Sequence, residues 1–370
     1  MDFKLTEERQ MLQDGLRRYL AANVTPEGIR QTDENGTGLD TALWQGLTDM
    51  GLPGAMLPEE HGGFGGGGFD IMVVFEELGR AGAVTPLIET AVLAGGLLGE
   101  AGRTEEVGDI IDGRLVAFAH GEPASRYDLN RVQTRAERTG DGWHLTGRKA
   151  VVHHASAADT LVVSARTSGD ADAEAGISLF LVPADAVQLR DYPVYGGGHA
   201  AEVALDCSVP AAALVAEEGK AFPMIERANA RAAAAQCAEA LGLMETIKSL
   251  TVDYLRQRRQ FGQPIGKFQA LQHRMADMLI EIEQARSAVI NLCGHLASGA
   301  GERELHVSAT KNLIGRVGKL VAEEAIQMHG GIGMTQEYAL GHFAKRLTMV
   351  DHRFGDTDFH LERFIRLSAA

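Results

Sequence analysis

The first part of the chain shows apolar residues at helical spacing. Leu16 and Leu20 belong to a stripe that repeats every four residues, and Thr6 stands before it, followed by two glutamates. This order is typical of a helix start, because the hydroxyl accepts a hydrogen bond from a free N–H and carboxylates suit the positive helix end. A second helix is predicted over 69–80, so residues 1–112 are expected to form a helical N-terminal domain.

The pattern changes to alternation and short apolar runs over residues 113–216. Alternating residues lead to Asp141-Gly142, a typical hairpin signal. The runs LVVSA from Leu161 and ISLFLVP from Ile177 predict buried strands, and the polar SGDADAEAG between them predicts a solvated loop. We therefore expect a central β domain.

The chain becomes helical again over residues 217–370. Its longest apolar stripe alternates spacings of three and four, at Phe268, Leu271, Met275, Met278, Ile282, Ala285, Val289, Leu292 and Leu296. Such a stripe is typical of a long bundle helix whose apolar side chains pack in the core. The predicted fold class is α+β, with an N-terminal helical domain, a central β domain and a C-terminal four-helix-bundle domain.

Composition and charge restrict the function classes. The 370 residues exceed what one compact core usually supports, so more than one subdomain is expected. The net charge of −15 argues against binding to nucleic acid or to an acidic membrane, because both select for a basic face. An anionic ligand would need a local cluster of arginine or lysine.

The cysteines and the N-terminus indicate the compartment. Cys207, Cys237 and Cys293 lie far apart and form no C-x-x-C pair, which fits a reducing compartment and predicts neither a metal site nor a disulfide framework. The segment MDFKLTEERQ is charged and lacks the apolar core of a signal peptide, and no apolar run reaches membrane-spanning length. We expect a cytoplasmic protein.

A glycine-rich segment, HGGFGGGGF, precedes the helix predicted at 69–80. Its amides could cradle a phosphate, but it lacks the Lys-Ser/Thr ending of a P-loop. We interpret it as a flexible surface loop.

Two further segments suggest a ligand site. RRQFGQPIGKFQ contains Arg258 beside Phe261 and Gly262; a guanidinium matches phosphate oxygens, although an exposed arginine also suits a helix C-terminus. QMHGGIGMTQEY, from Gln327, contains glycines that leave room for a ligand against bare backbone, although a turn alone explains them.

Together these segments resemble the acyl-CoA dehydrogenase family. The pattern R-x-x-F-G-x-P-I-x-x-x-Q is followed about sixty residues later by Q-x-x-G-G-x-G, and GLPGAMLPEEHGGFG with FEELGR is similar to the family's first domain. The resemblance covers essentially the whole chain. It implies an FAD enzyme that oxidises the Cα–Cβ bond of an acyl-CoA thioester: a carboxylate removes the α proton while the β hydrogen leaves as hydride to the flavin.

The resemblance also implies residue roles and partners. Arg258 would contact the FAD pyrophosphate, and Phe261 would pack near it. The other positions implied to meet the cofactor are Gln269, Gln327, Gly331 and Thr357. In the family this arm reaches the FAD of a neighbouring subunit, so a homo- or hetero-oligomer is expected. Electron-transfer flavoprotein is the electron acceptor that the family implies.

The positions of the catalytic carboxylate depart from the family. Where relatives have Y-E-G-T, this chain reads Phe354, Gly355, Asp356 and then threonine, and the base position on an earlier helix is Ala232. An α proton needs a positioned base, and neither position supplies one.

The flavin-facing β domain departs as well. Relatives read T-E-P-G-x-G-S-D where this chain has GEPASRYD, from Gly121 to Asp128. In the family's K-x-W-I-T/S motif, Val151 replaces a ring that would stack on the flavin, and His153 replaces a hydroxyl.

These departures leave several hypotheses. In the first, the chain is an active enzyme and Asp356 is the base, although Asp356 or the next threonine also suits a helix N-cap. In the second, the chain is the base-deficient companion subunit of a heterotetramer that completes the partner's FAD site; the ending with Phe354 and His360 is similar to the small subunits of such pairs. A flavin monooxygenase on the same fold is a third alternative.

Overall fold

The computed structural model describes residues 5–34 and 36–369. The chain forms two compact units. The helical unit comprises Met1–Ile29, Gly68–Ala83 and Ala233–Ala370, and the sheet unit comprises Arg30–Gly67 and Val84–Ala232. Helices α2 and α8 run from one unit into the other. In the described parts of the chain, no helix is both long and apolar enough to cross a membrane.

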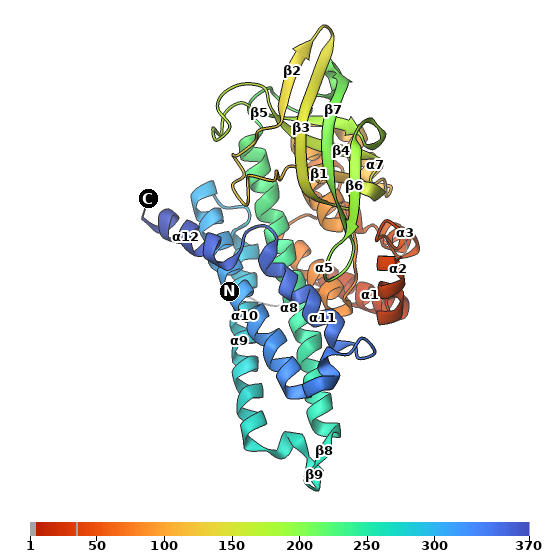
Figure 1. Ribbon diagram of the computed structural model, residues 1–370, viewed down its shortest axis with the longest axis vertical. Coiled ribbons are helices and arrows are strands. Elements are labelled where there is room, and N and C mark those ends of the chain that lie inside the picture. The colour runs from red at the N-terminus through yellow and green to blue at the C-terminus, as the bar shows by residue number, and fades with distance from the viewer. Residues whose placement is uncertain (1–4, 35, 370) are drawn as a thin grey trace. The chain divides into compact units, whose positions relative to one another are not determined.

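The helical unit is built on long helices, as the apolar stripes predict (Figure 1). Its helices are α1 (Glu7–Asn23), α5 (Gly68–Ala81), most of α8 (Phe222–Gln257), α9 (Gln269–His295), α10 (Ala300–His329), α11 (Leu340–Met349) and α12 (Thr357–Ser368). The Thr6 side chain caps α1 by accepting the N–H of Arg9, which confirms the predicted helix start. The stripe on α9 is buried from Met275 to Leu292, as predicted.

Two glycines allow α5 and α8 to pack closely. A Cβ on Gly79 would lie 2.0 Å from the carbonyl oxygen of Glu239, and a Cβ on Gly242 would lie 2.0 Å from that of Glu76. Each glycine therefore faces the backbone of the opposite helix, and any larger residue would push the helices apart.

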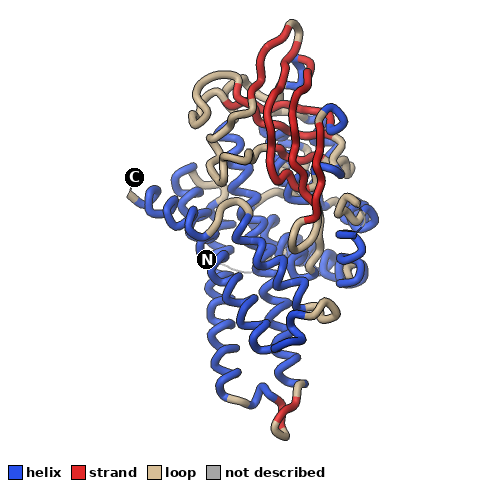
Figure 2. The backbone as a smooth tube through the Cα atoms, viewed as in Figure 1, coloured by secondary structure: helices blue, strands red, loops and turns tan. Residues whose placement is uncertain are grey.

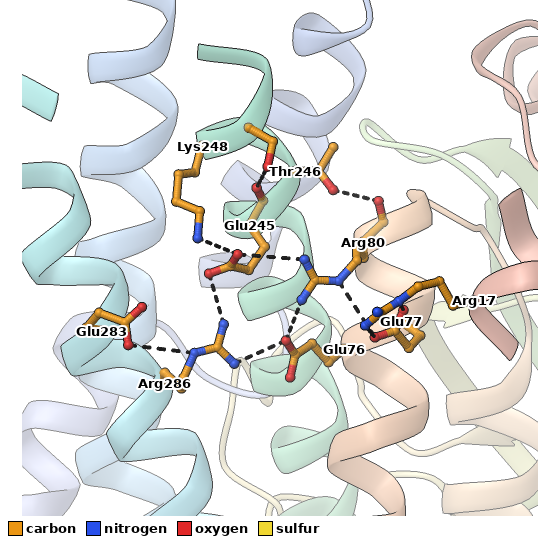
Figure 3. A network of polar contacts seen from close by, with 10 residues as sticks. Arg17, Glu76, Glu77, Arg80, Glu245, Thr246, Lys248, Glu283 and Arg286 are labelled. Carbon is orange, nitrogen blue, oxygen red and sulfur yellow. Dashed lines mark hydrogen bonds and ion pairs between the residues drawn. The ribbon is translucent and has the colours of Figure 1, made fainter. Parts of the chain in front are cut away.

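A network of charged side chains ties α9 to α5 and α8 within this unit (Figure 3). Arg286 on α9 donates to Glu76 at 3.1 Å and to Glu245 at 2.9 Å. On the other side of α5, Arg17 binds Glu77 through two N–H groups at 2.9 and 2.6 Å. The three glutamates are buried, so these guanidinium groups compensate charges that would otherwise lack a solvent shell.

The sheet unit contains a seven-stranded sheet, shown in red in Figure 2. Its strands are β1 (Val116–Ala119), β2 (Arg135–Thr139), β3 (Gly142–His153), β4 (Thr160–Arg166), β5 (Ile177–Pro183), β6 (Gln188–Pro193) and β7 (His199–Pro210). The order is β1-β4-β2-β3-β7-β6, and β5 pairs with β4. The helices of this unit are α3 (Thr41–Asp49), α4 (Leu52–Ala55), a π-helix (Ile88–Gly95), α6 (Gly96–Glu100) and α7 (Thr104–Ile111).

The structure confirms the α+β fold class and the predicted strands. The hairpin β2–β3 pairs Thr139 with Gly142, so its turn is Gly140-Asp141, one residue earlier than predicted. Gly140 takes φ of 54°, the left-handed conformation that such a turn requires. The boundaries of the three-domain division remain a prediction.

The polar loop between β4 and β5 is organised by a buried arginine. The Arg166 guanidinium donates to the carbonyl oxygens of Ala171, Ala173 and Ala175 at 2.9 to 3.0 Å. The loop is largely exposed, as predicted, but its carbonyl groups face this buried cation. A single side chain thereby fixes the path of the loop.

The glycine-rich segment is a surface loop packed against residues 54–58. A Cβ on Gly63 would lie 2.1 Å from the carbonyl oxygen of Leu57, and one on Gly65 would lie 2.6 Å from that of Ala55. The same two carbonyl oxygens accept backbone hydrogen bonds from the loop: Leu57 from the N–H of Gly65 at 3.1 Å, and Ala55 from that of Gly66 at 2.8 Å. These glycines therefore serve close backbone packing, an explanation that the flexible-loop interpretation missed.

Candidate cofactor and active site

A small hairpin follows α8 and presents the first predicted ligand motif. It consists of β8 (Arg259–Gln260) and β9 (Gln263–Pro264), joined by Phe261 and Gly262, which both take positive φ, 52° and 80°. This is the backbone of a tight two-residue turn, in which a phenylalanine is unusual. Phe261 is 90% exposed, and its ring meets Phe268 edge-on at 6.0 Å between centroids. The chain therefore holds an aromatic ring in solvent at a conformational cost.

Three polar side chains at this end of the helical unit have uncommitted hydrogen-bonding groups. Arg258 follows the last residue of α8, Gln269 begins α9, and Gln327 lies in the last turn of α10, all exposed. Across residues 5–34 and 36–369, none of the three side chains has a hydrogen-bond or ion-pair partner. The Arg258 guanidinium is thus free to bind an anion.

A ring stack links the two predicted motifs. The His329 imidazole at the end of α10 lies 4.4 Å from the Tyr254 ring, centroid to centroid, with 24° between the planes. Tyr254 precedes Arg258 by one helical turn, and His329 follows Gln327 by two residues. Burial lowers the pKa of His329, and its Nδ1 bonds to the carbonyl of Ala325 at 2.8 Å. The neutral imidazole therefore acts as a packing element that keeps both motifs at one end of the unit.

The glycines after α10 leave open space. Gly330 takes φ of 67° and ends the helix, as predicted. A Cβ built on Gly330 or Gly331 would meet no described atom within 4 Å. With the exposed Arg258 nearby in the fold, these features suit the phosphates of a dinucleotide, so the chain's residues fit the cofactor arm that the resemblance implies.

The backbone corner before α12 leaves no room for a side chain at Gly355. Gly355 takes φ of 103°, and a Cβ on it would lie 2.3 Å from Nε2 of His360. His360 is buried, and its Nε2 bonds to the carbonyl oxygen of Phe354 at 2.8 Å. Burial lowers the pKa of His360 to about 3, so the ring is neutral and Nε2 carries the proton that it donates.

Asp356 and Thr357 both participate in this corner. The Asp356 carboxylate accepts the N–H of Phe359 at 2.8 Å and is the N-cap of α12, the second role that the sequence suggests for it. The Thr357 hydroxyl donates to Asp351 at 2.7 Å. The base role of Asp356 and the cofactor role of Thr357 stay predictions.

A fully buried lysine donates hydrogen bonds to the backbone just before this corner. Lys311 Nζ donates to the carbonyl oxygens of Val350 and Arg353 at 2.7 and 2.8 Å. Burial lowers the pKa of Lys311 to about 8. No sequence pattern indicated this role of Lys311, because a lysine on a long helix normally lies in solvent.

The sheet unit contains a second buried charge. Lys149 Nζ binds Glu122 at 2.8 Å and Ser164 at 3.1 Å, and Glu122 also accepts the N–H groups of Gln133 and Thr134. Burial lowers the pKa of Lys149 to about 8. For Glu122, burial acts to raise the pKa, but the lysine and the N–H donors outweigh it and leave the pKa lowered. This pair ties β3 to the segment around Glu122.

Strand β3 has an irregularity directly beyond Lys149. Its pairing register with β7 shifts between Lys149 and Val152, and Val151, which is 53% exposed, takes φ of 53°. Left-handed backbone is strained for a β-branched residue. Val151 is therefore an exposed residue with strained backbone, at the position that the resemblance assigns to a ring stacking on the flavin.

Comparison with known proteins identifies the family. The models of the acyl-CoA dehydrogenase N-terminal, middle and C-terminal domains match residues 6–106, 117–202 and 222–366. The chain belongs to the acyl-CoA dehydrogenase family. It is 28% identical over 380 residues to the probable acyl-CoA dehydrogenase YngJ of Bacillus subtilis, with 99% of this chain and 98% of the relative covered.

Two similar solved structures of the family carry paired names. A chain of the ChsE4–ChsE5 complex from Mycobacterium tuberculosis has a TM-score of 0.88 and 28% identity, covering 100% of this chain and 99% of that one. A variant of the Tcur3481–Tcur3483 steroid ACAD has a TM-score of 0.86 and 30% identity, covering 98% of both chains.

Neither position that the resemblance assigns to the catalytic base has a carboxylate here. A side chain at Gly355 would collide with the His360 imidazole. The earlier position, Ala232, is fully buried, and the neighbouring Arg231 donates to the carbonyl oxygens of Gly66 and Met56 at 2.8 and 2.7 Å. The sequence showed that the glutamate is missing. It did not show that His360 blocks its return.

Proposed function

We propose that this chain is a subunit of an FAD-dependent acyl-CoA dehydrogenase whose catalytic carboxylate comes from a second family subunit. The observation that carries the proposal is the closed corner at Gly355. A side chain there would collide with His360, and the neighbouring Asp356 carboxylate is engaged in capping α12. Asp356 could act as a base only by giving up this hydrogen bond.

On this proposal, the chain contributes a cofactor arm to the FAD site of its partner. Arg258 would bind the pyrophosphate as a cation, Phe261 would pack beside it, and Gln269 and Gln327 would donate hydrogen bonds. The bare backbone at Gly331 would let the cofactor approach. Bound FAD would accept the β hydrogen of the acyl-CoA as hydride. The exposure of these side chains supports this role, as does the lack of hydrogen-bond partners for Arg258, Gln269 and Gln327 among the described residues.

The sheet unit supports the proposal that the two subunits have different roles in flavin binding. Val151 presents no ring for flavin stacking. We therefore place the working flavin on the partner's side. The two similar structures with paired names are consistent with a heteromer. A heterotetramer and electron-transfer flavoprotein as acceptor are part of the proposal.

Purification of the chain alone and together with a candidate sister subunit tests this function. Flavin absorbance and its bleaching by acyl-CoA without oxygen are measured for each preparation. We expect bleaching only with the sister subunit present. A yellow chain that bleaches alone would favour the single-subunit enzyme with Asp356 as base. A chain that consumes reduced flavin and oxygen would favour a monooxygenase.

A further inference from the structure

Three metal-ligating side chains converge at the turn between α9 and α10. His295 is the last residue of α9, Glu302 lies in the first turn of α10, and His306 follows one turn later. One ligand atom from each lies within 4.8 Å of the others. His295 Nε2 is 3.7 Å from a Glu302 oxygen, and the two imidazole rings stack with centroids 3.8 Å apart.

We propose that His295, Glu302 and His306 bind one divalent transition-metal ion, with Zn²⁺ the best match. Two imidazoles and a carboxylate are a ligand set that Zn²⁺ uses, with water in the remaining position. Ligands at about 2.0–2.1 Å from a tetrahedral ion lie roughly 3.4 Å from one another. The 3.7 Å between His295 and Glu302 is already close to this spacing. The two rings lie 29° from parallel, so they must rotate out of their stack to direct both lone pairs at one ion, and their partly exposed positions leave room for this.

Hydrogen bonds orient the two imidazoles for this role. His295 Nδ1 lies 2.8 Å from the carbonyl oxygen of Asn291, so Nδ1 carries the proton and Nε2 presents its lone pair. Asn291 Nδ2 lies 2.9 Å from His306 Nδ1, so in this structure the amide N–H donates to that ring nitrogen. Ion binding through His306 Nε2 requires the amide to turn by 180°, after which its oxygen accepts the proton of Nδ1. In that state one asparagine supports both ligands, as outer partners do in metal sites.

The geometry of the turn explains why the three meet. Glu302 and His306 are four residues apart on α10 and therefore share one face. His295 arrives from the preceding helix, so a bound ion would join the end of α9 to the start of α10. A stacked histidine pair with a nearby carboxylate could serve only as surface packing, but the convergence of three ligand atoms is what an ion site requires. The cysteine-based sequence argument could not detect a site without cysteines.

Metal titration of the purified, metal-free chain tests the proposal. Co²⁺ is the probe, because its visible absorption reports ligand geometry, and Zn²⁺ is then added as a competitor. We expect the chain to bind one Co²⁺, which Zn²⁺ displaces. In His306→Gln the affinity for Co²⁺ should fall by at least about tenfold, because loss of even an outer partner of a metal ligand typically lowers metal affinity by about 10- to 100-fold. Glu302→Gln is a second variant in case the first does not fold.

His273→Gln is the matched control, since His273 is exposed on α9 away from the turn. This control should bind Co²⁺ as the wild type does. The proposal is overturned if the wild-type chain binds no Co²⁺, or if His306→Gln and Glu302→Gln both bind it as tightly as the control. Flavin content is independent of this outcome.

Discussion

The imidazole of His360 occupies the space that a side chain on Gly355 would need. The distance from a Cβ at Gly355 to His360 Nε2 is 2.3 Å, and the φ of 103° disfavours any other residue. A carboxylate side chain at this position would therefore collide with His360 and strain the backbone.

Replacing Gly355 should destabilise the chain without creating a base. We expect Gly355→Ala to lower the free energy of unfolding by about 1–3 kcal/mol, because it combines backbone strain with a clash. Gly301→Ala, in open space on α10, should change it by less than about 1 kcal/mol. Urea unfolding measures both. Gly355→Glu should give no acyl-CoA bleaching in the chain alone; a stable, bleaching variant would contradict this account of the corner.

Asp356 should act mainly as a helix cap. Asp356→Ala is expected to cost about 1 kcal/mol of stability, because the N–H of Phe359 loses its acceptor. Asp356→Asn keeps an acceptor and should be close to the wild type. Thermal unfolding and turnover of the reconstituted complex are measured together. Loss of turnover in the stable asparagine variant would establish the base role instead.

The pH dependence of stability should reveal the neutral His360. Burial lowers its pKa to about 3, whereas the unfolded chain protonates a histidine near 6.5. Between these values only the unfolded state binds the proton, so stability falls as pH drops through this window. Near pH 5, His360→Asn should reduce the slope of unfolding free energy against pH by about 1.4 kcal/mol per pH unit. His273→Asn, at an exposed position on α9, is the control for replacing a histidine.

The charge network around Arg286 should matter more than a surface ion pair. Arg286→Met leaves the buried Glu76 and Glu245 with fewer partners, and we expect a loss of about 1.5–3 kcal/mol. Arg274→Met breaks a pair with Glu324 whose side chains are 45% and 31% exposed, and should cost below about 1 kcal/mol. Equal effects in urea unfolding would show that burial of the network adds nothing.

Local patterns in the sequence predicted much of the fold. The α9 stripe, the Thr6 cap and the strands at Leu161 and Ile177 all follow from side-chain periodicity or from one capping residue. Such signals depend on neighbours in the sequence, so one chain suffices to detect them. The hairpin turn was displaced by one residue because Asp141-Gly142 and Gly140-Asp141 are both acceptable turn pairs.

Features that depend on distant residues could not be predicted. Gly79 and Gly242 are required by the backbone of another helix, and Lys311 and His360 act on a loop that only the fold brings to them. Each compact unit combines segments that are separate in the sequence, so the division into units could not be predicted either. For the site, the motifs identified Arg258 and Gln327, but the Tyr254–His329 stack that connects their two segments is a tertiary contact.

The most direct test of the central claim is the FAD content of the complex reconstituted from this chain and its sister subunit. With Arg258→Ala in this chain alone, we expect FAD affinity to fall on the order of tenfold or more, because a charged hydrogen-bond donor to the pyrophosphate is lost. Arg256→Ala, an exposed arginine on the last turn of α8, should retain full FAD. Unchanged FAD affinity in the Arg258→Ala complex would contradict the proposal that this chain completes its partner's cofactor site.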